Sequence, residues 1–282
     1  MLTTDRQPFD TGYQYIFQRD ELQAIKACHD AHGFAVVRDV ISPDDVAALK
    51  ADVDASLNPK GDLGAGETRY DTVFVENAPA MLRLLENDTF MAIARTVVDP
   101  DPVVNRSAAI LKNVGAKAGG WHSDFDFKAA APDASMNGGE WPNGLWFYLT
   151  GSHPDAGGLA VIENSHRPDW PGPEGYTLRD DRKWFEPADG DWSGIDPLTD
   201  IPGTVPLICN PTDLVIFAAR TYHAPNAHQG TQPRYSVALV MRPRMKMNID
   251  WPLRDSAKRL LAALPPHLAP YFEHYTSLRE PT

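Results

Sequence analysis

One histidine and two aspartates occupy alternate positions in the segment "GGWHSDFDFK", residues 119–128: His122, Asp124 and Asp126. On a β-strand, residues i, i+2 and i+4 share one face. The imidazole and the carboxylates could therefore converge on a metal ion, because both groups are metal ligands. A solvated strand face would show the same pattern, so the segment alone leaves both interpretations open.

A further histidine, His223, follows the apolar segment "DLVIFAA" at 213–219. Two neutral imidazoles and one carboxylate on one face of Fe(II) leave three coordination positions open. A chelating cosubstrate can occupy two of these positions and dioxygen the third. The two histidines and one carboxylate would therefore suit an iron-dependent oxygenase.

Arg234 and Ser236 lie two residues apart in the next apolar segment, so they share one face of a predicted strand. A guanidinium binds a carboxylate through two parallel hydrogen bonds, and a neighbouring hydroxyl adds another. An iron site beside a carboxylate receptor indicates a 2-oxoglutarate-dependent oxygenase. Fe(II), 2-oxoglutarate and O2 are therefore the predicted cofactor and cosubstrates.

The segments that must position these residues are short and apolar. They lie at 108–114, 145–151, 157–163, 205–210, 213–219 and 234–243. Strands at this density, without intervening helical patterns, predict a sandwich or jelly roll rather than a parallel α/β sheet. The predicted fold class is mainly β with flanking helices (α+β), with the jelly-roll core at 101–245.

Two long connections interrupt the predicted strands, at 128–143 and 167–204. Connections of this length in a compact domain are usually functional lids or disordered segments. In the second one, Trp170, Trp184 and Trp192 favour a packed cover. We therefore expect both connections to form lid loops over a substrate.

Residues 1–100 are predicted to support the core with helices and short strands. A helical pattern at 19–33 ends on Gly33, and the next helix starts with Ser42 as N-cap and Asp45 completing a capping box. The tail at 246–282 carries a helical apolar stripe, which we expect to pack back on the domain or to form dimer contacts. The prediction for residues 1–282 is one domain, as a monomer or homodimer.

Composition narrows the possible partners and the compartment. The chain of 282 residues has a formal net charge of −12, which argues against nucleic acid or an anionic membrane as a partner. No apolar run approaches the roughly 20 residues that span a bilayer, and no secretory signal is visible. Cys28 and Cys209 are far apart in the sequence and suit a reducing compartment. We therefore expect a cytoplasmic protein that acts on a small molecule.

Four segments, in this order, resemble the phytanoyl-CoA dioxygenase family of non-haem Fe(II)/2-oxoglutarate oxygenases. They are "HGFAVVRDVISPDDVAALKADV", "WHSD", "LWFYLTGSHPDAGGLAVIENSHRP", and "DLVIFAARTYHAPN" followed by Arg234. The resemblance implies a double-stranded β-helix, a jelly roll, over most of the chain. Two departures from the family pattern occur. After the distal histidine, Ala224 and Pro225 stand in place of the family's common Gly-Ser pair, and the central block ends "ENSH" where the family usually shows a Pro-Gly turn before Ser-His.

The resemblance assigns roles to individual residues. His122, Asp124 and His223 would be the iron ligands. Arg234 would bind the distal carboxylate of 2-oxoglutarate, and Ser236 would assist it. Trp146 would line the cosubstrate pocket, unless it serves only in core packing.

Two further residues are candidates for contact with the substrate. The family spacing selects Asp124 as the ligand, which leaves Asp126 for the pocket wall or for a solvated or salt-bridged position. Arg220 precedes the distal histidine and would reach the mouth of the site or form a salt bridge at a strand edge. Lys112 and Arg242 are further cations that an anionic substrate would require.

The predicted reaction is hydroxylation of a C–H bond in a small polar metabolite or natural-product intermediate, with release of succinate and CO2. The acids and tryptophans of 167–204 suit a polar or cationic substrate better than a polyanionic CoA ester. One alternative is a cupin-like dioxygenase or isomerase that does not use 2-oxoglutarate. Another is a jelly-roll binding protein without turnover. Arg234 and Ser236 argue against the first alternative, and the complete ligand set against the second.

Overall fold

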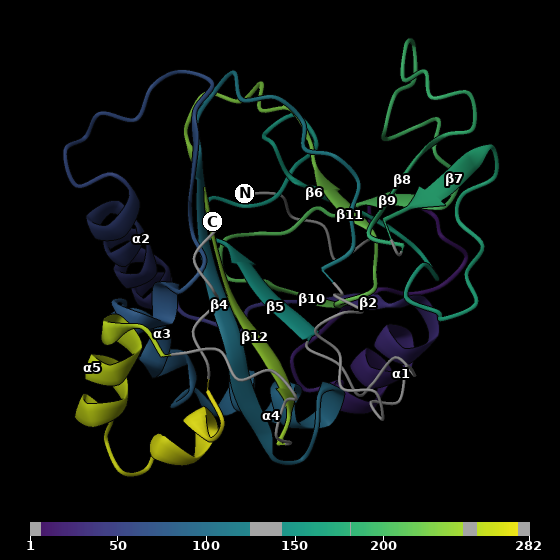
Figure 1. Ribbon diagram of the computed structural model, residues 1–282. Helices are drawn as coiled ribbons and strands as arrows, with labels where there is room; N and C mark the ends of the chain where they lie inside the picture. The colour runs from purple at the N-terminus through teal and green to yellow at the C-terminus, as the bar shows by residue number, and fades with distance from the viewer. Residues whose placement is uncertain (1–6, 125–142, 181, 245–252, 276–282) are drawn as a thin grey trace.

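The computed structural model describes residues 7–124, 143–180, 182–244 and 253–275. Its main sheet has seven strands, which pair antiparallel except for the parallel edge pair β1–β2 (Figure 1). The order of the strands is β1 (Ile16–Phe17), β2 (Phe34–Val37), β10 (Leu214–Ala218), β5 (Asn143–Tyr148), β12 (Arg234–Pro243), β4 (Pro102–Lys112) and β3 (Thr68–Asp71).

A smaller sheet lies to one side of the main sheet and contains β11 (His223–Pro225), β6 (Leu159–Ile162) and β9 (Thr204–Pro206). A hairpin of β7 (Tyr176–Arg179) and β8 (Trp184–Pro187) lies next to it (Figure 1). His122 connects the hairpin to the small sheet through bridges to Trp184 and His223. The prediction of a mainly β fold with a double-stranded β-helix core is therefore confirmed.

Helices cover the face of the main sheet that is turned away from the small sheet. In Figure 1, α2 (Pro43–Leu57), α3 (Pro79–Leu84) and α5 (Asp255–Ala263) lie on the opposite side of β4 and β12 from β6 and β11. The remaining helices are α1 (Leu22–His32), α4 (Asp88–Val97) and the 3-10 turns η1 (Phe74–Glu76) and η2 (Ala269–Phe272). The main hydrophobic core joins these helices to the main sheet.

The helix boundaries near the N-terminus confirm the sequence prediction. Gly33 ends α1 with a φ of 87°, in the left-handed region that favours glycine. A Cβ atom at this position would come within 2.6 Å of His166 Nδ1 and 2.7 Å of Thr221 Oγ1. Ser42 caps α2 by accepting from the backbone N–H of Asp45, whose carboxylate accepts in return from the Ser42 N–H.

Strand β4 lies between the helical layer and the interior of the jelly roll, and its side chains face the two sides alternately. Ser107, Ala109 and Leu111 are buried, and Ser107 Oγ accepts from the N–H of Val75 in η1. The residues that alternate with them, at 106, 108 and 110, are partly exposed and line a cavity, which Ser107 and Ala109 also border. A strand with period two therefore presents one face to the core and the other to the cavity.

The segment 167–204, predicted to be a loop, contains the β7–β8 hairpin instead. Phe185 of β8 is 1% exposed and packs with Trp121, Tyr176 and Tyr222 in a second hydrophobic cluster. The sequence prediction missed these strands because each is only four residues long and is stabilised by aromatic contacts distant in the sequence. The other predicted lid, at 128–143, lies outside the described residues except for Asn143.

The tail is helical, as predicted, and its described part packs on the domain. Arg242 Nη2 donates to the carbonyl of His274 at 3.2 Å, and Tyr275 Oη donates to Glu76 Oε1 at 3.0 Å. These bonds join the end of β12 and the turn η1 to the segment after η2. Residues 246–252 and 276–282 of the predicted tail lie outside the described residues.

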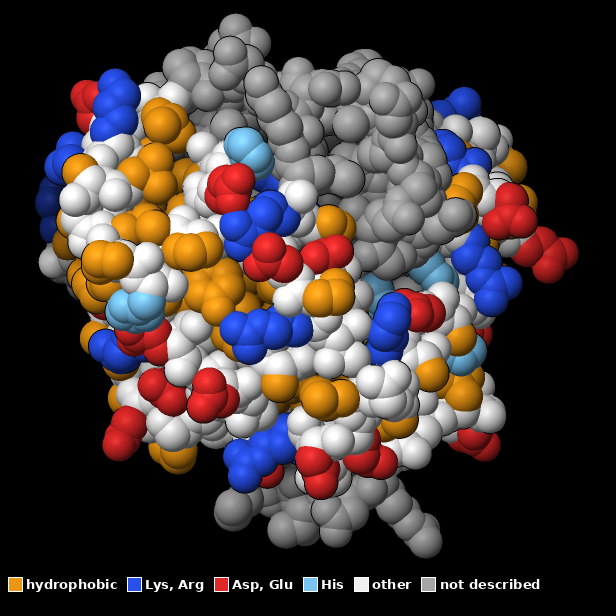
Figure 2. Space-filling model, turned by 90° about the horizontal axis from the view of Figure 1, so that it is seen from below, with side chains coloured by type: hydrophobic (Ala, Val, Ile, Leu, Met, Phe, Trp, Pro, Cys, Tyr) orange, Lys and Arg blue, Asp and Glu red, His pale blue; other side chains and the backbone are white. Residues whose placement is uncertain are grey.

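The helices and the surface bear on possible partners. Within the described ranges, no helix is long and apolar enough to cross a membrane. On the face seen from below, Lys and Arg side chains are interspersed with Asp and Glu (Figure 2). Apolar side chains gather on one side of the same face.

Candidate active site

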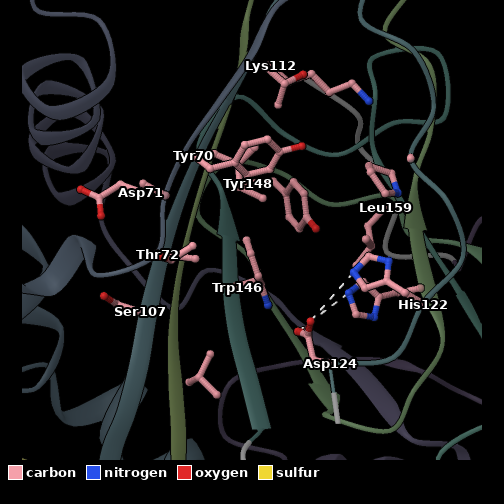
Figure 3. A pocket seen from close by; sticks show the side chains of 18 of the residues that line it. Tyr70, Asp71, Thr72, Ser107, Lys112, His122, Asp124, Trp146, Tyr148 and Leu159 are labelled. Carbon is pink, nitrogen blue, oxygen red and sulfur yellow. Dashed lines mark ion pairs between the residues drawn. The ribbon is translucent and has the colours of Figure 1, made fainter. Parts of the chain in front are cut away.

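A cavity of about 400 Å³ lies between the main sheet and the small sheet. Figure 3 shows Lys112 toward one end of it and Asp124 toward the other, with Trp146 and Tyr148 between them. The second wall includes Leu159 of β6 and both histidines of the predicted metal site. Cavities of roughly this size are typical for small-molecule ligands.

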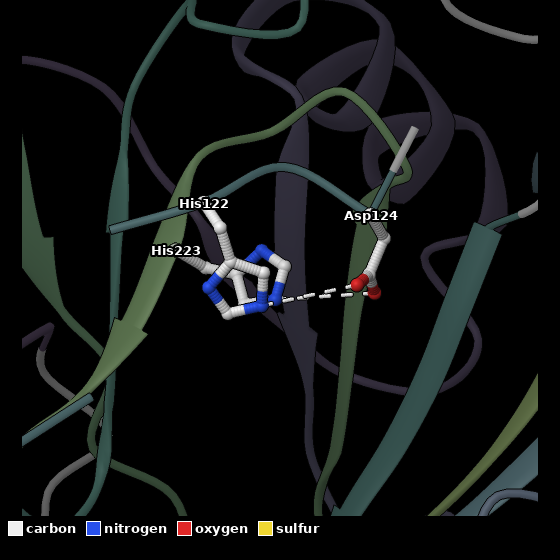
Figure 4. A group of neighbouring side chains, drawn as sticks. All are labelled: His122, Asp124 and His223. Atoms are coloured by element: carbon white, nitrogen blue, oxygen red, sulfur yellow. Dashed lines mark ion pairs between the residues drawn. The ribbon is translucent and has the colours of Figure 1, made fainter. Parts of the chain in front are cut away.

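The two candidate histidines are held side by side by their own backbones. The N–H of His122 donates to the carbonyl of His223 at 3.1 Å, and the N–H of His223 donates back at 2.9 Å. The ring centroids are 4.4 Å apart (Figure 4). Two residues more than 100 positions apart in sequence are therefore placed by one antiparallel pair of hydrogen bonds.

A backbone carbonyl also fixes the orientation of each imidazole. His122 Nδ1 lies 2.9 Å from the carbonyl oxygen of Gly120, and His223 Nδ1 lies 2.9 Å from that of Thr221. A carbonyl only accepts, so Nδ1 carries the proton in both rings. Nε2 is then the unprotonated nitrogen, with its lone pair available to a metal ion.

Asp124 completes the group from the same segment as His122. Its Oδ1 lies 3.9 Å from His122 Nε2, and its Oδ2 lies 3.9 Å from His223 Nε2. One ligand atom from each of the three residues lies within 4.8 Å of the others. This spacing matches three ligands arranged around one ion (Figure 4).

The charge states of the group also suit a metal ion. Burial alone would raise the pKa of Asp124, but the positive charges of His223, Arg106 and His122 outweigh it and lower the pKa to about 2. Burial, together with the neighbouring His122, lowers the pKa of His223 to about 4. At neutral pH the group therefore offers a carboxylate and a neutral distal imidazole.

The β7–β8 hairpin forms hydrogen bonds with both chain segments that carry the candidate metal ligands. The N–H of Ser123, between the two ligands, donates to the carbonyl of Lys183 at 2.9 Å. Tyr222, next to His223, donates its hydroxyl to the carbonyl of Arg182. The turn of the hairpin thus holds both ligand-bearing segments, a function that the sequence analysis did not predict.

Arg234 lies at the other end of the cavity from Asp124, beside Tyr148. The Arg234 side chain is 3% exposed, and its Nη1 donates to the carbonyl of Gly157. Its guanidinium lies 5.4 Å from the ring centroid of Tyr148. Burial lowers the pKa of Arg234, as expected for a buried cation that lacks a full counter-charge.

The three predicted cosubstrate residues each bury a polar atom without a hydrogen-bond partner in the part of the chain that the structure describes. These atoms are Arg234 Nε, Ser236 Oγ and Trp146 Nε1. An unpaired buried polar atom costs about 1–3 kcal/mol. Trp146 both packs against Phe217 and lines the cavity, so its two predicted roles coexist. Ser236 is fully buried and is not among the described residues that line the cavity.

Of the three cations suggested for an anionic substrate, Lys112 is among the described residues that line the cavity, and Arg220 and Arg242 are not. Lys112 lies opposite Arg234 across the β4–β12 pair, and its ammonium donates to the carbonyls of Lys117 and Asn226. Burial, aided by Arg234, lowers the pKa of Lys112 to about 8. Arg242 donates instead to the carbonyl of its neighbour Pro243 and to that of His274 in the tail.

The two residues proposed for substrate contact are not brought to the cavity within the described part of the chain. Arg220 is 7% exposed and is not among the residues that line the cavity. Burial, together with the neighbouring Arg182, lowers the pKa of Arg220 to about 10. Asp126 lies outside the described residues. Arg106 also lines the cavity, six residues before Lys112 on the same face of β4, but it precedes the strand segment predicted at 108–114 and was not predicted.

The sequence model of one protein family, described as phytanoyl-CoA dioxygenase (PhyH), matches residues 29–236 and thus most of the chain. The chain belongs to the phytanoyl-CoA dioxygenase family. As a family member it is a non-haem iron, 2-oxoglutarate-dependent oxygenase, which uses Fe(II), 2-oxoglutarate and O2. No curated protein sequence matches this family member significantly.

Several solved structures share the fold of this phytanoyl-CoA dioxygenase family member. The non-haem epimerase SnoN from nogalamycin biosynthesis is 19% identical, with a TM-score of 0.56 over 78% of this chain and 82% of SnoN. HygX from Streptomyces hygroscopicus, with nickel and 2-oxoglutarate bound, is 17% identical, with a TM-score of 0.56 over 80% and 88%. EctD from S. alaskensis is 20% identical, with a TM-score of 0.54 over 77% and 75%. At these identities, the likeness supports the fold alone.

Proposed function

We propose that this protein hydroxylates a C–H bond of a small polar metabolite or natural-product intermediate. In this proposal, residues 1–282 act as one oxygenase domain. His122, Asp124 and His223 hold the iron, and Arg234, Ser236 and Trp146 hold the cosubstrate. When bound, iron and 2-oxoglutarate activate O2, and one oxygen atom enters the substrate while the other enters succinate as CO2 leaves.

The observation that supports this proposal most strongly is the combination of two features in one cavity. Three potential metal ligands converge there with their lone pairs and carboxylate oxygens directed at one point. A buried guanidinium, whose Nε has no partner among the described residues, lines the same cavity, and so does Trp146 with its unpaired indole N–H. A cupin-like enzyme without 2-oxoglutarate would have no use for a buried cation of this kind.

The residues of the chain supply binding, orientation and exclusion of water. The carbonyls of Gly120 and Thr221 keep the protons of His122 and His223 on Nδ1, away from the metal side. Arg234 would hold the distal carboxylate of the dianion through paired N–H donors, with Tyr148 packed against its guanidinium. Phe217 and Trp146 close the cavity with apolar surface.

Isotope labelling tests the proposed reaction. The protein is incubated with Fe(II), 2-oxoglutarate and a panel of small polar metabolites under ¹⁸O2, and the products are analysed by mass spectrometry. Hydroxylation predicts one ¹⁸O atom in the new hydroxyl group and one in succinate. A product that has lost hydrogen or changed configuration without gaining oxygen would assign a different reaction to the same site.

A pair of variants tests which carboxylate is the ligand. We expect Asp124→Ala to lose Fe(II)-dependent turnover, because the group would retain only two imidazoles. Asp126→Ala is expected to keep Fe(II) binding and to change substrate affinity at most. Iron content after anaerobic loading measures the difference. Loss of iron in Asp126→Ala together with retention in Asp124→Ala would reverse the assignment.

A further inference from the structure

The cavity face of β4 carries one cation near each end. Arg106 and Lys112 lie on this face, with Ala108 and Ile110 between them. Six residues of strand separate the two cations, or roughly 20 Å at about 3.3 Å per residue. Lys112 pairs across the sheet with Arg234, so one end of the cavity already has two cations.

Arg106 lies at the end of the cavity near the metal ligands, and in the described part of the chain more of its N–H donors are free than those of Lys112. Its Nη2 is 3.6 Å from Asp124 Oδ2, which is an ion pair but too long for a hydrogen bond. The Arg106 side chain is 28% exposed, and it lines the cavity. Within the described ranges, Asp124 is the one acid with which Arg106 forms an ion pair. A guanidinium has five N–H donors, so most of them remain available to a ligand.

The charge balance of the whole cavity favours an anionic ligand in addition to 2-oxoglutarate. Among the described lining residues, the cations are Arg106, Lys112 and Arg234, and the acids are Asp71 and Asp124. The Asp71 carboxylate accepts hydrogen bonds from a serine hydroxyl and a backbone amide, and it points away from the metal group in Figure 3. A 2-oxoglutarate dianion and an iron dication cancel each other. The three cations outnumber the two acids by one, so positive charge remains in the cavity.

We propose that Arg106 binds a carboxylate of the substrate beside the metal site, so that the substrate is a small carboxylic acid. This inference rests on the proposed function of the same site, because it assigns Arg234 to 2-oxoglutarate and leaves Arg106 for the substrate. A single guanidinium with parallel N–H donors suits one planar carboxylate. The acids of 167–204 predict a polar or cationic substrate, whereas an arginine lines the described cavity wall beside the metal ligands.

Paired probes test the inference on the full-length protein, loaded anaerobically with Fe(II) and excess 2-oxoglutarate. The probes are small carboxylic acids, each compared with its primary amide, and binding is measured from the rise in Tm with probe concentration. In the wild type we expect acids to bind about 10- to 100-fold more tightly than their amides. Arg106→Gln is expected to abolish this preference, and Arg106→Lys to keep part of it.

Arg69→Gln is the matched control for loss of an arginine from a neighbouring strand. Arg69 lies on β3, is similarly exposed, and binds Glu67 and Asp62 rather than lining the cavity. This variant is expected to retain the full preference for acids. The control therefore separates a local effect of Arg106 from a general effect of charge.

Two results would overturn the inference. The wild type could bind no acid in preference to its amide, or Arg106→Gln could retain the preference. If Arg106→Gln retains the preference and binds iron less tightly, Arg106 supports Asp124 and not the substrate. Failure of the proposed function would look different. If 2-oxoglutarate does not bind in this cavity, the wild type forms no visible charge-transfer band with Fe(II) and 2-oxoglutarate, and if the reaction is not hydroxylation, the product gains no ¹⁸O.

Discussion

His223→Ala is expected to lower Fe(II)-dependent turnover of 2-oxoglutarate by more than about 100-fold, since even the outer partners of metal ligands are worth about 10- to 100-fold. His223 is 5% exposed, and its Nε2 faces the carboxylate of Asp124. No other described imidazole nitrogen apart from that of His122 joins this group. Succinate formation and iron content per chain measure the effect.

His153→Ala provides the control for loss of a histidine. The His153 side chain is 46% exposed and does not line the cavity. We expect this variant to bind iron and to turn over 2-oxoglutarate like the wild type. Wild-type iron content and turnover in His223→Ala would show that the metal is bound elsewhere.

Arg234→Met is expected to weaken 2-oxoglutarate binding by at least about 30-fold. Removing one partner of a buried, hydrogen-bonded charge pair costs about 2–5 kcal/mol, and each 1.4 kcal/mol is a factor of about ten. Methionine retains much of the apolar bulk beside Tyr148 but removes every N–H donor. The measurement is the rise in Tm caused by 2-oxoglutarate in the Fe(II)-loaded protein.

Two comparisons make the Arg234 result specific. Iron alone is expected to raise the Tm of Arg234→Met as it does for the wild type, because the metal ligands are unchanged. Arg167→Met, which removes an exposed arginine bonded to the carbonyl of Ala31, is expected to keep the full response to 2-oxoglutarate. An unchanged response in Arg234→Met would place the cosubstrate carboxylate on another residue, with Lys112 the first to examine.

The sequence predicted features that depend on local or short-range patterns. The capping box at Ser42 and the left-handed Gly33 are local, and the structure has both. The apolar segments were long enough to predict the inner strands of the main sheet, except for the first part of β4 at 102–107. The short edge strands such as β3 were not predicted. The grouping of His122, Asp124 and His223 followed from a resemblance rather than from periodicity, because no local pattern places residue 122 next to residue 223.

The features that the sequence did not predict depend on contacts between distant segments. The β7–β8 hairpin is stabilised by Phe185 and Tyr222 packing across the small sheet, and neither residue signals a strand by itself. Arg106 was missed because its meaning depends on Asp124, which is brought to within 3.6 Å of it only by the fold. An arginine on an alternating strand has the same sequence pattern whether it faces water or a metal site.

Anaerobic titration of the metal-free protein with Fe(II), followed by 2-oxoglutarate, tests the central claim most directly. The visible absorption of an iron-bound 2-oxo acid reports both cofactors at once. We predict that this charge-transfer band appears only after both are added and that it saturates at one 2-oxoglutarate per chain. Binding of iron without any band would contradict the assignment of 2-oxoglutarate to this cavity, and absence of iron binding would contradict the metal site itself.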